Sequence, residues 1–250
     1  MKTLDNLIAL DLMLSGSCWE LIKDLNGFAD HQGTILSTQV SKGRNFQIMM
    51  LASNNLDSRN LNRVKVRLLE DGYICWLSIS ELLGNAFKSN SFQPRLITEV
   101  EIQKRISAVL KWVEDASTKA NKYLWGGTLG PDFDCSGLVQ AAFASQKIWL
   151  PRDAYQQERF CNPIEVEPCK LENLLPGDLI FFGNDQKCTH VALHLNDGFF
   201  WHSSGLLNGH NGIGIDCLHP NDKNPVACYY RSILRGAGRV HRCHDGTTLP

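Results

Sequence analysis

The four residues Asp134-Cys135-Ser136-Gly137 decide how the second half of this 250-residue chain is interpreted. They follow the glycine-containing stretch YLWGG (123–127) and precede the apolar run 138–143, which predicts a helix. A cysteine in the first turn of a helix lies at the positive end of the helix dipole, which favours the thiolate over the thiol. We therefore expect Cys135 to be a nucleophile, although a cysteine in a helix is also a common buried hydrophobic residue.

Two downstream histidines are candidates for the base and the orienting group that such a nucleophile needs. Residues 189–195 and 199–203 have the composition of strands, and the Asn-Asp-Gly turn between them predicts a hairpin. A three-residue loop would set His202 opposite Ala192 and His190 diagonally across on the same face. A two-residue loop would break this parity. His194 shares the face of His190 and is an alternative base.

The chemistry that fits this arrangement is acyl transfer. The Cys135 thiolate would attack an amide carbonyl, His190 would protonate the leaving amine, and His202 would hold the other ring nitrogen of His190. The backbone N–H of Cys135 and the hydroxyl group of Tyr123 are candidates for stabilising the oxyanion. Asp134 has a simpler alternative role as the N-cap of the helix.

The remaining patterns predict a β-rich first part and a second part in which helices precede strands. Short strands between about residues 19 and 83 indicate a small barrel, and the polar segment 85–94 indicates a linker. Thr98 and Glu101 form a potential capping box ahead of a helix. A second helix is expected over 135–146 and a short third one after Pro151. The expected strands are 36–40, 46–51, 64–68, 179–182, 189–195, 199–203 and 238–241, and the fold class is α+β.

Composition disfavours several classes of function. The net charge of −1 provides no field that would recruit nucleic acid or an anionic membrane. Asp5 and Asp11 interrupt the apolar stretch near the start of the chain, so we expect no signal peptide, a cytoplasmic location and nine reduced cysteines. The HRCH run at 241–244 lacks a second pair of ligands, so we expect no metal and no cofactor.

These residues resemble the NlpC-type cysteine peptidases of bacterial cell walls, which have a papain-like α+β fold. The resemblance covers about residues 105–241. It is carried by YLWGG (123–127), DCSGL (134–138), LPRDAYQQ (150–157), PGDLIFF (176–182), THVALHL (189–195) and HSS (202–204). The family implies Cys135 as the nucleophile, His190 as the base and His202 as the orienting residue. Because His190 leads the family's strand motif, the resemblance selects His190 over His194.

The first part resembles the bacterial SH3-like barrel attached to a cyanobacterial-type branch of this family. The likeness lies in EDGYICWL (70–77) and around residues 24–26 and 43–44, although Ile74-Cys75 stands where Pro-Gly is usual. The resemblance implies an SH3-like barrel domain at 1–86. A linker with the start of the first helix would occupy 87–104, and the NlpC-type peptidase domain 105–245.

The branch implies a substrate as well. Its enzymes hydrolyse the γ-D-glutamyl–diaminopimelate bond of peptides such as L-Ala-γ-D-Glu-meso-diaminopimelate, and the barrel closes around the free amine of L-Ala. A buried ammonium needs a carboxylate, for which Glu70 is the first candidate and Asp71 and Asp134 follow. We expect Tyr73, Tyr123 and Trp125 to form the pocket walls and Ser136 to bind the D-Glu carboxylate. Tyr73 fits the barrel core equally well, and Glu70 fits an exposed turn.

Three other functions stay open at this point. A hydrolase of intact cell wall is one, although a signal peptide would be expected for it. An inactive module that binds wall peptides is another, which Cys135, His190 and His202 disfavour because all three are present. An acyltransferase would need an apolar channel, which the sequence does not indicate. The expected partner is the peptide substrate, without nucleic acid or membrane.

Overall fold

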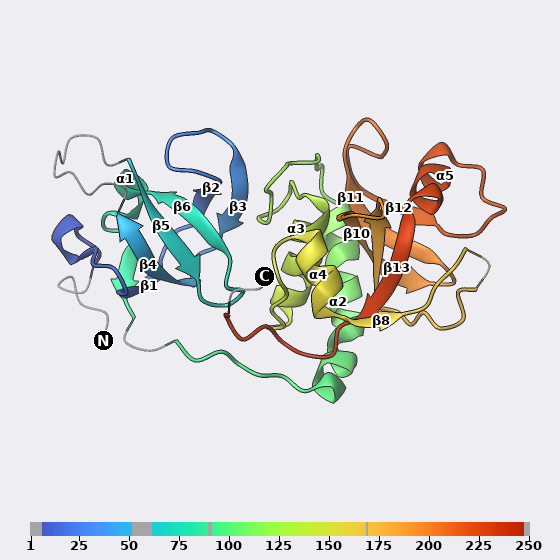
Figure 1. Ribbon diagram of the computed structural model, residues 1–250, viewed down its shortest axis with the longest axis horizontal. Coiled ribbons are helices and arrows are strands. Elements are labelled where there is room, and N and C mark those ends of the chain that lie inside the picture. The colour runs from blue at the N-terminus through green and yellow to red at the C-terminus, as the bar shows by residue number, and fades with distance from the viewer. Residues whose placement is uncertain (1–6, 52–61, 90–91, 169, 248–250) are drawn as a thin grey trace. The chain divides into compact units, whose positions relative to one another are not determined.

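The computed structural model describes residues 7–51, 62–89, 92–168 and 170–247. The chain divides into two compact units, which Figure 1 shows as ribbons. One unit comprises Met1–Arg95 together with Asp245–Leu249, and the other comprises Leu96–His244. In the described part of the chain, no helix combines the length and apolar character that crossing a membrane requires.

The first unit is built on a seven-stranded sheet with the order β3-β2-β6-β5-β4-β1-β7. All its pairings are antiparallel. The strands predicted at 36–40, 46–51 and 64–68 are confirmed to within one residue at each end. Its elements are the 3-10 helix η2 (Leu10–Leu12), β1 (Cys18–Leu21), β2 (Leu25–Phe28), β3 (Leu36–Val40), β4 (Asn45–Leu51), β5 (Arg63–Leu68), β6 (Ile74–Ser78), α1 (Ile79–Leu82) and β7 (Ala86–Lys88).

The predicted closed barrel is not found. Strands β3 and β7 lie at the two edges of the sheet, and among the described residues no pairing joins them, so the SH3-like barrel is not confirmed. Residues 86–88, expected in the linker, instead form β7 and pair with β1. Alternation along β5 buries Val64, Val66 and Leu68 in a core that also contains Trp19.

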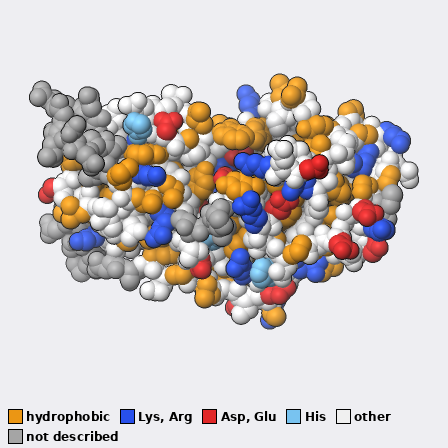
Figure 2. All heavy atoms as spheres, viewed as in Figure 1, with side chains coloured by type: hydrophobic (Ala, Val, Ile, Leu, Met, Phe, Trp, Pro, Cys, Tyr) orange, Lys and Arg blue, Asp and Glu red, His pale blue; other side chains and the backbone are white. Residues whose placement is uncertain are grey.

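The second unit combines helices with a six-stranded sheet of order β12-β11-β10-β9-β13-β8. Figure 1 shows α2, α3 and α4 together on one side of this sheet. Helices followed by antiparallel strands confirm the α+β prediction, although β8, β12 and α5 had not been expected. The elements are α2 (Glu99–Ser117), α3 (Cys135–Ser145), α4 (Ala154–Phe160), β8 (Asn162–Ile164), β9 (Leu179–Gly183), β10 (Cys188–Asn196), β11 (Phe199–Ser204), β12 (Gly212–Cys217), α5 (Pro225–Ser232) and β13 (Leu234–Arg239). Basic and acidic side chains are interspersed on the face of this unit in Figure 2.

Side-chain caps set the beginnings of the helices. The capping box of α2 is confirmed, since the Glu101 N–H donates to Thr98 Oγ1 and the Thr98 N–H donates to Glu101 Oε2. Asp134 caps α3 by accepting from the Gly137 N–H at 2.6 Å. Helix α4 begins three residues after Pro151, because Asp153 rather than the proline forms its N-terminal cap.

The β10–β11 hairpin has a two-residue loop and a β-bulge, where we expected a three-residue loop. Asn196 pairs with Phe199, so the loop has two residues, Asp197 and Gly198, with φ angles of 44° and 74°. This is the geometry of a type I′ turn, not the three-residue loop that we expected. A β-bulge between His194 and Asn196 then restores the register, and Leu193 pairs with Trp201. The two strands thereby bring the His190 and His202 rings together, with Nε2 of the first 2.9 Å from Nδ1 of the second.

Candidate active site

Cys135 is the first residue of α3 and is only 6% exposed. The helix begins directly on the preceding loop, because the Asp134 N–H donates to the Gly127 carbonyl at 3.2 Å. A Cβ at Gly137 would lie 2.0 Å from that same carbonyl oxygen. Only glycine permits this approach, so the backbone of the loop fixes the position of the helix N-terminus and of Cys135.

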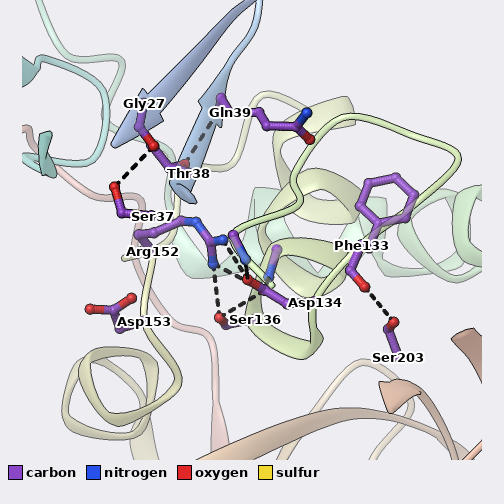
Figure 3. Close-up of polar contacts among 12 residues, drawn as sticks. Gly27, Ser37, Thr38, Gln39, Phe133, Asp134, Ser136, Arg152, Asp153 and Ser203 are labelled. Carbon is purple, nitrogen blue, oxygen red and sulfur yellow. Dashed lines mark hydrogen bonds and ion pairs between the residues drawn. The ribbon is translucent and has the colours of Figure 1, made fainter. Parts of the chain in front are cut away.

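A buried ion pair holds the residues on both sides of Cys135 (Figure 3). Arg152, 2% exposed, places Nη2 at 2.6 Å from Asp134 Oδ2 and Nη1 at 3.1 Å from Asp134 Oδ1. Its Nη1 also donates to the Ser136 hydroxyl at 3.0 Å. Because Asp134 further accepts from the Gly126 and Gly137 N–H groups, its two oxygens are fully engaged. Both oxygens of Asp134 thus accept from protein donors, and the Ser136 hydroxyl, which we expected to bind the D-Glu carboxylate, accepts from Arg152.

Burial around Cys135 favours the thiol form, whereas the sequence led us to expect a thiolate. Burial, and then the neighbouring Asp134 carboxylate, raise the pKa of the Cys135 thiol to about 12. The N–H groups of Val191 and Ser136 and the charge of Arg152 oppose this rise without cancelling it. The helix dipole is present, but the buried carboxylate at its N-cap and the loss of solvent outweigh it.

Two imidazoles and a carboxylate form a hydrogen-bonded line in the sheet. His190 Nε2 lies 2.9 Å from His202 Nδ1, and His202 Nε2 lies 2.7 Å from Asp216 Oδ2. Asp216 is 3% exposed and His202 is fully buried. The carboxylate accepts a hydrogen bond from the His202 Nε2–H, so His202 Nδ1 carries no proton and accepts from the His190 Nε2–H. His190 then has no proton on Nδ1, and that nitrogen is available as a base.

Burial favours the neutral form of both imidazoles. Burial and the neighbouring His202 lower the pKa of His190 well below its usual value. Burial also lowers the pKa of His202, although the hydrogen bond to Asp216 opposes that effect. The sulfur accepts a hydrogen bond from the Val191 N–H, the residue next to His190. The structure therefore brings a neutral thiol and a neutral imidazole base to neighbouring positions.

His194 has a structural role. Its Nε2 accepts from the Gly198 N–H at 3.2 Å, so its Nδ1 carries the proton and donates to the Leu175 carbonyl at 2.9 Å. Both nitrogens are thus bound to backbone, and the ring braces the hairpin turn. The geometry therefore favours His190 as the base.

Two tyrosines border the nucleophile and the imidazoles. The Tyr230 ring, carried by α5, lies 4.6 Å from the His190 ring and 4.7 Å from the His202 ring between centroids. Burial raises the pKa of both Tyr230 and Tyr123, so both phenols stay protonated. Ser203, the neighbour of His202, donates to the Phe133 carbonyl at 2.6 Å and ties β11 to the loop before Cys135 (Figure 3).

The other residues predicted to bind substrate are distributed over both units. Trp125 is 68% exposed on the loop before α3. Glu70, Asp71 and Tyr73 belong to the first unit, where Arg44 Nε lies 3.1 Å from Glu70 and Arg44 Nη2 lies 2.8 Å from Asp71. Burial alone would lower the pKa of Arg44, but the two carboxylates raise it, so the guanidinium stays charged. Glu70 is buried, not an exposed turn residue, and Tyr73 packs against the core.

Sequence reasoning missed three residues of this site: Arg152, Asp216 and Tyr230. Arg152 lies inside the LPRDAYQQ motif, and its burial depends on the fold of the loop around it. Asp216 lies on β12, which pairs with β11. In this pairing His202 lies opposite Gly214, two residues before Asp216. The signal that could have identified Asp216 is an acidic residue in the otherwise apolar strand sequence GIGIDC.

Comparison with known proteins matches this region to one family. The model of the NlpC/P60 family matches residues 120–219, which contain the nucleophile and the line of imidazoles. A gamma-D-glutamyl-L-lysine dipeptidyl-peptidase of Bacillus cereus is 43% identical over 84 residues, covering 32% of this chain and 24% of that protein. The bifunctional muramidase/DL-endopeptidase CwlT of Bacillus subtilis is 38% identical over 123 residues, covering 47% of this chain and 32% of that protein.

The chain therefore spans about a quarter to a third of the length of these two relatives. A solved NlpC/P60 family structure from Bacillus cereus aligns with 91% of this chain and 64% of that one, at 23% identity and a TM-score of 0.44. The NlpC/P60 family model thus matches residues 120–219, and the relatives that resemble part of this chain include proteins named as peptidases.

Proposed function

We propose that this protein is a cysteine peptidase that cleaves the γ-D-glutamyl–diamino acid bond of peptidoglycan-derived peptides. The observation that carries the proposal is the 2.9 Å contact between His190 Nε2 and His202 Nδ1, in a domain whose helix begins at Cys135. The names of two relatives, a γ-D-glutamyl-L-lysine dipeptidyl-peptidase and a DL-endopeptidase, support this bond type. The finer proposal is meso-diaminopimelate as the diamino acid and a free L-Ala at the amino end.

The proposed reaction has two stages. As the Cys135 sulfur attacks the carbonyl carbon of D-Glu, His190 Nδ1 takes the thiol proton, and Asp216 stabilises the resulting imidazolium through His202. The oxyanion receives the Cys135 N–H and the Tyr123 hydroxyl group. His190 then protonates the leaving amine of the diamino acid, which leaves a thioester. Water, deprotonated by His190, hydrolyses the thioester and restores the thiol.

We further propose that the first unit is an SH3-like module that selects the free amine. Glu70 and Asp71 are both buried beside Arg44, and Glu70 Oε1 also accepts from the Asn45 N–H at 2.7 Å. An ammonium is the group that such carboxylates attract. Glu70 stays the first candidate, with Asp71 second. Asp134 ranks third, because its carboxylate already accepts from Arg152 and from the Gly126 and Gly137 N–H groups.

Peptides with a free L-Ala amine arise after the stem peptide leaves the glycan, so we place the activity in cytoplasmic recycling. A second candidate function is hydrolysis of stem peptides in intact wall, which the muramidase/DL-endopeptidase relative favours. In intact wall the L-Ala amine is tied to muramic acid, so it offers no ammonium to the carboxylates of the first unit.

One experiment separates these functions. The protein is incubated with L-Ala-γ-D-Glu-meso-diaminopimelate, its lysine analogue, the N-acetylated form and purified sacculi, and products are identified by mass. We expect rapid release of L-Ala-γ-D-Glu from the free tripeptide, much slower cleavage of the acetylated form, and no activity in the Cys135→Ala control. Efficient digestion of sacculi would favour the second candidate. Binding of the peptides without any cleavage would indicate a non-catalytic module.

A further inference from the structure

We propose that His202, His210 and Asp216 form a binding site for a divalent transition metal ion such as Zn²⁺, and that its occupancy switches off the base His190. The site goes beyond the sequence prediction that no metal binds. Its inhibitory consequence rests on the proposed peptidase function, whereas the binding itself does not.

The three ligand atoms already converge. His202 Nε2 and His210 Nε2 lie 2.7 and 2.8 Å from the same atom, Asp216 Oδ2, and all three atoms lie within 4.8 Å of one another. At ordinary Zn–N and Zn–O lengths, two ligands of a tetrahedral zinc ion are about 3.4 Å apart. The imidazoles therefore need to withdraw from the carboxylate by only about half an ångström to admit the ion.

Three features of the cluster support a built site. The second carboxylate oxygen, Asp216 Oδ1, is buried and has no hydrogen-bond partner among the described residues, which leaves it available to an added cation. A Cβ at Gly214 would lie 2.2 Å from the His210 ring, so glycine at this position makes the room in which that ring lies. The His210 side chain is 32% exposed, while His202 and Asp216 are buried, so His210 gives the ion a path from solvent.

The donor set selects the class of ion. Two imidazoles with one carboxylate suit zinc and its transition-metal neighbours, whereas calcium and magnesium prefer all-oxygen sites. The Asp216 carboxylate supplies one negative charge to a buried place, which offsets part of the cost of dehydrating the ion. Zinc is therefore the first ion to test.

Metal binding would invert the hydrogen bond on which the base depends. Zinc on His202 Nε2 displaces that proton to solvent, so the ring keeps its proton on Nδ1 and must donate to His190 Nε2. The shared proton moves from His190 Nε2 to His202 Nδ1, and His190 gains a proton on Nδ1 from solvent. Both rings stay neutral, but His190 now presents N–H where the thiol requires a lone pair. The ion would thus inhibit without touching Cys135.

Binding is tested first, with Co²⁺ as the optical probe and the full chain carrying Cys135→Ala. We expect visible d–d bands of a nitrogen and oxygen site without a thiolate charge-transfer band. His210→Gln in the same background should lower the Co²⁺ affinity at least ~10-fold, because even residues that only support a ligand cost that much. His219→Gln, a change of an exposed histidine elsewhere in the unit, should leave the spectrum unchanged. Equal binding by the His210→Gln and His219→Gln proteins would overturn the site.

Inhibition is tested next, on the tripeptide substrate with Zn²⁺ buffered at stated free concentrations. We expect reversible loss of turnover that a chelator restores, and an inhibition constant at least ~10-fold weaker in His210→Gln, whose metal-free turnover stays within about twofold of the parent. If zinc inhibits both proteins equally, it acts at the Cys135 thiol and the proposed switch is wrong. If Co²⁺ binds through His210 but the protein cleaves no peptide, the metal site stands and the proposed peptidase function fails.

Discussion

Single residues define the chemistry of this site. The first of these residues is Cys135, whose reactivity depends on its protonation state. Because the pKa of the thiol is raised to about 12, the thiolate fraction at neutral pH is small and grows with pH. We expect alkylation of Cys135 by iodoacetamide to accelerate about tenfold per pH unit between about pH 7 and about pH 10. Peptide mapping by mass spectrometry measures this at Cys135 separately from the exposed Cys228. A rate already on a plateau at pH 7 would mean that the thiol is ionised in the resting protein.

Asp216 acts on the reaction through His202. We expect Asp216→Asn to lower kcat by ~10²-fold with little change in KM, because the amide no longer specifies the tautomer of His202 and cannot stabilise the imidazolium. His190→Ala should cost more, since it removes the base itself. Asp222→Asn, on the turn before α5, is the matched control and should keep full turnover. A loss in KM rather than kcat would assign Asp216 to substrate binding.

Arg152 stabilises the folded protein through its buried ion pair with Asp134. Arg152→Met leaves the buried Asp134 carboxylate without its partner and should lower the free energy of unfolding by about 3–5 kcal/mol. Arg235→Met breaks a partly exposed pair with Glu158 and should cost no more than about 1 kcal/mol. Urea denaturation of the three proteins compares the two losses. Similar values would show that burial does not distinguish the two pairs.

At the scale of elements, the start of α3 is determined by contact between two backbones. In Gly137→Ala the new Cβ would meet the Gly127 carbonyl, so the helix must move away from the loop. We expect a loss of about 1–3 kcal/mol together with most of the turnover, because the thiol moves with the helix. Ala141→Gly, in the same helix, should cost about 1 kcal/mol and leave turnover intact. Thermal melts and peptide hydrolysis on both variants separate displacement of the thiol from simple destabilisation.

Much of the fold could be predicted from local patterns, because caps and alternation act over a few residues. The capping box of α2, the helix at Cys135 and the strands that carry His190 and His202 are of this kind. The bulge in β10 could not be predicted, since it depends on how His194 binds backbone groups on both sides. Asp216 and Tyr230 reach the imidazoles through strand pairing and helix packing that join distant parts of the sequence. The rise in the pKa of the Cys135 thiol could not be predicted, because burial around Cys135 is a property of the folded unit.

At the scale of the whole molecule, the first unit depends on residues from both ends of the chain. A Cβ at Gly246 would lie 2.1 Å from the Leu69 carbonyl, and Gly246 has a φ of 79°, so Gly246→Ala is disfavoured twice. We expect Gly246→Ala to destabilise the first unit more than Gly16→Ala does. Gly16 has a similar φ of 84°, but a Cβ there would meet nothing within 4 Å. Hydrogen exchange should show faster opening of β5 and β6 in the Gly246 variant while α3 stays protected. Equal protection in both variants would mean that the contact at Leu69 contributes little.

The first unit contains residues from two separate parts of the chain, and this has a consequence for recombination and for protein engineering. A gene fragment ending near residue 95 would encode the seven strands of the first unit without the segment at 245–249 that belongs to it. Neither unit can therefore be exchanged as a cassette with one cut. A chimaera that replaces the second unit has to keep the codons for residues 245–247 behind the insert, so that the new domain is inherited as an insertion rather than as a fusion.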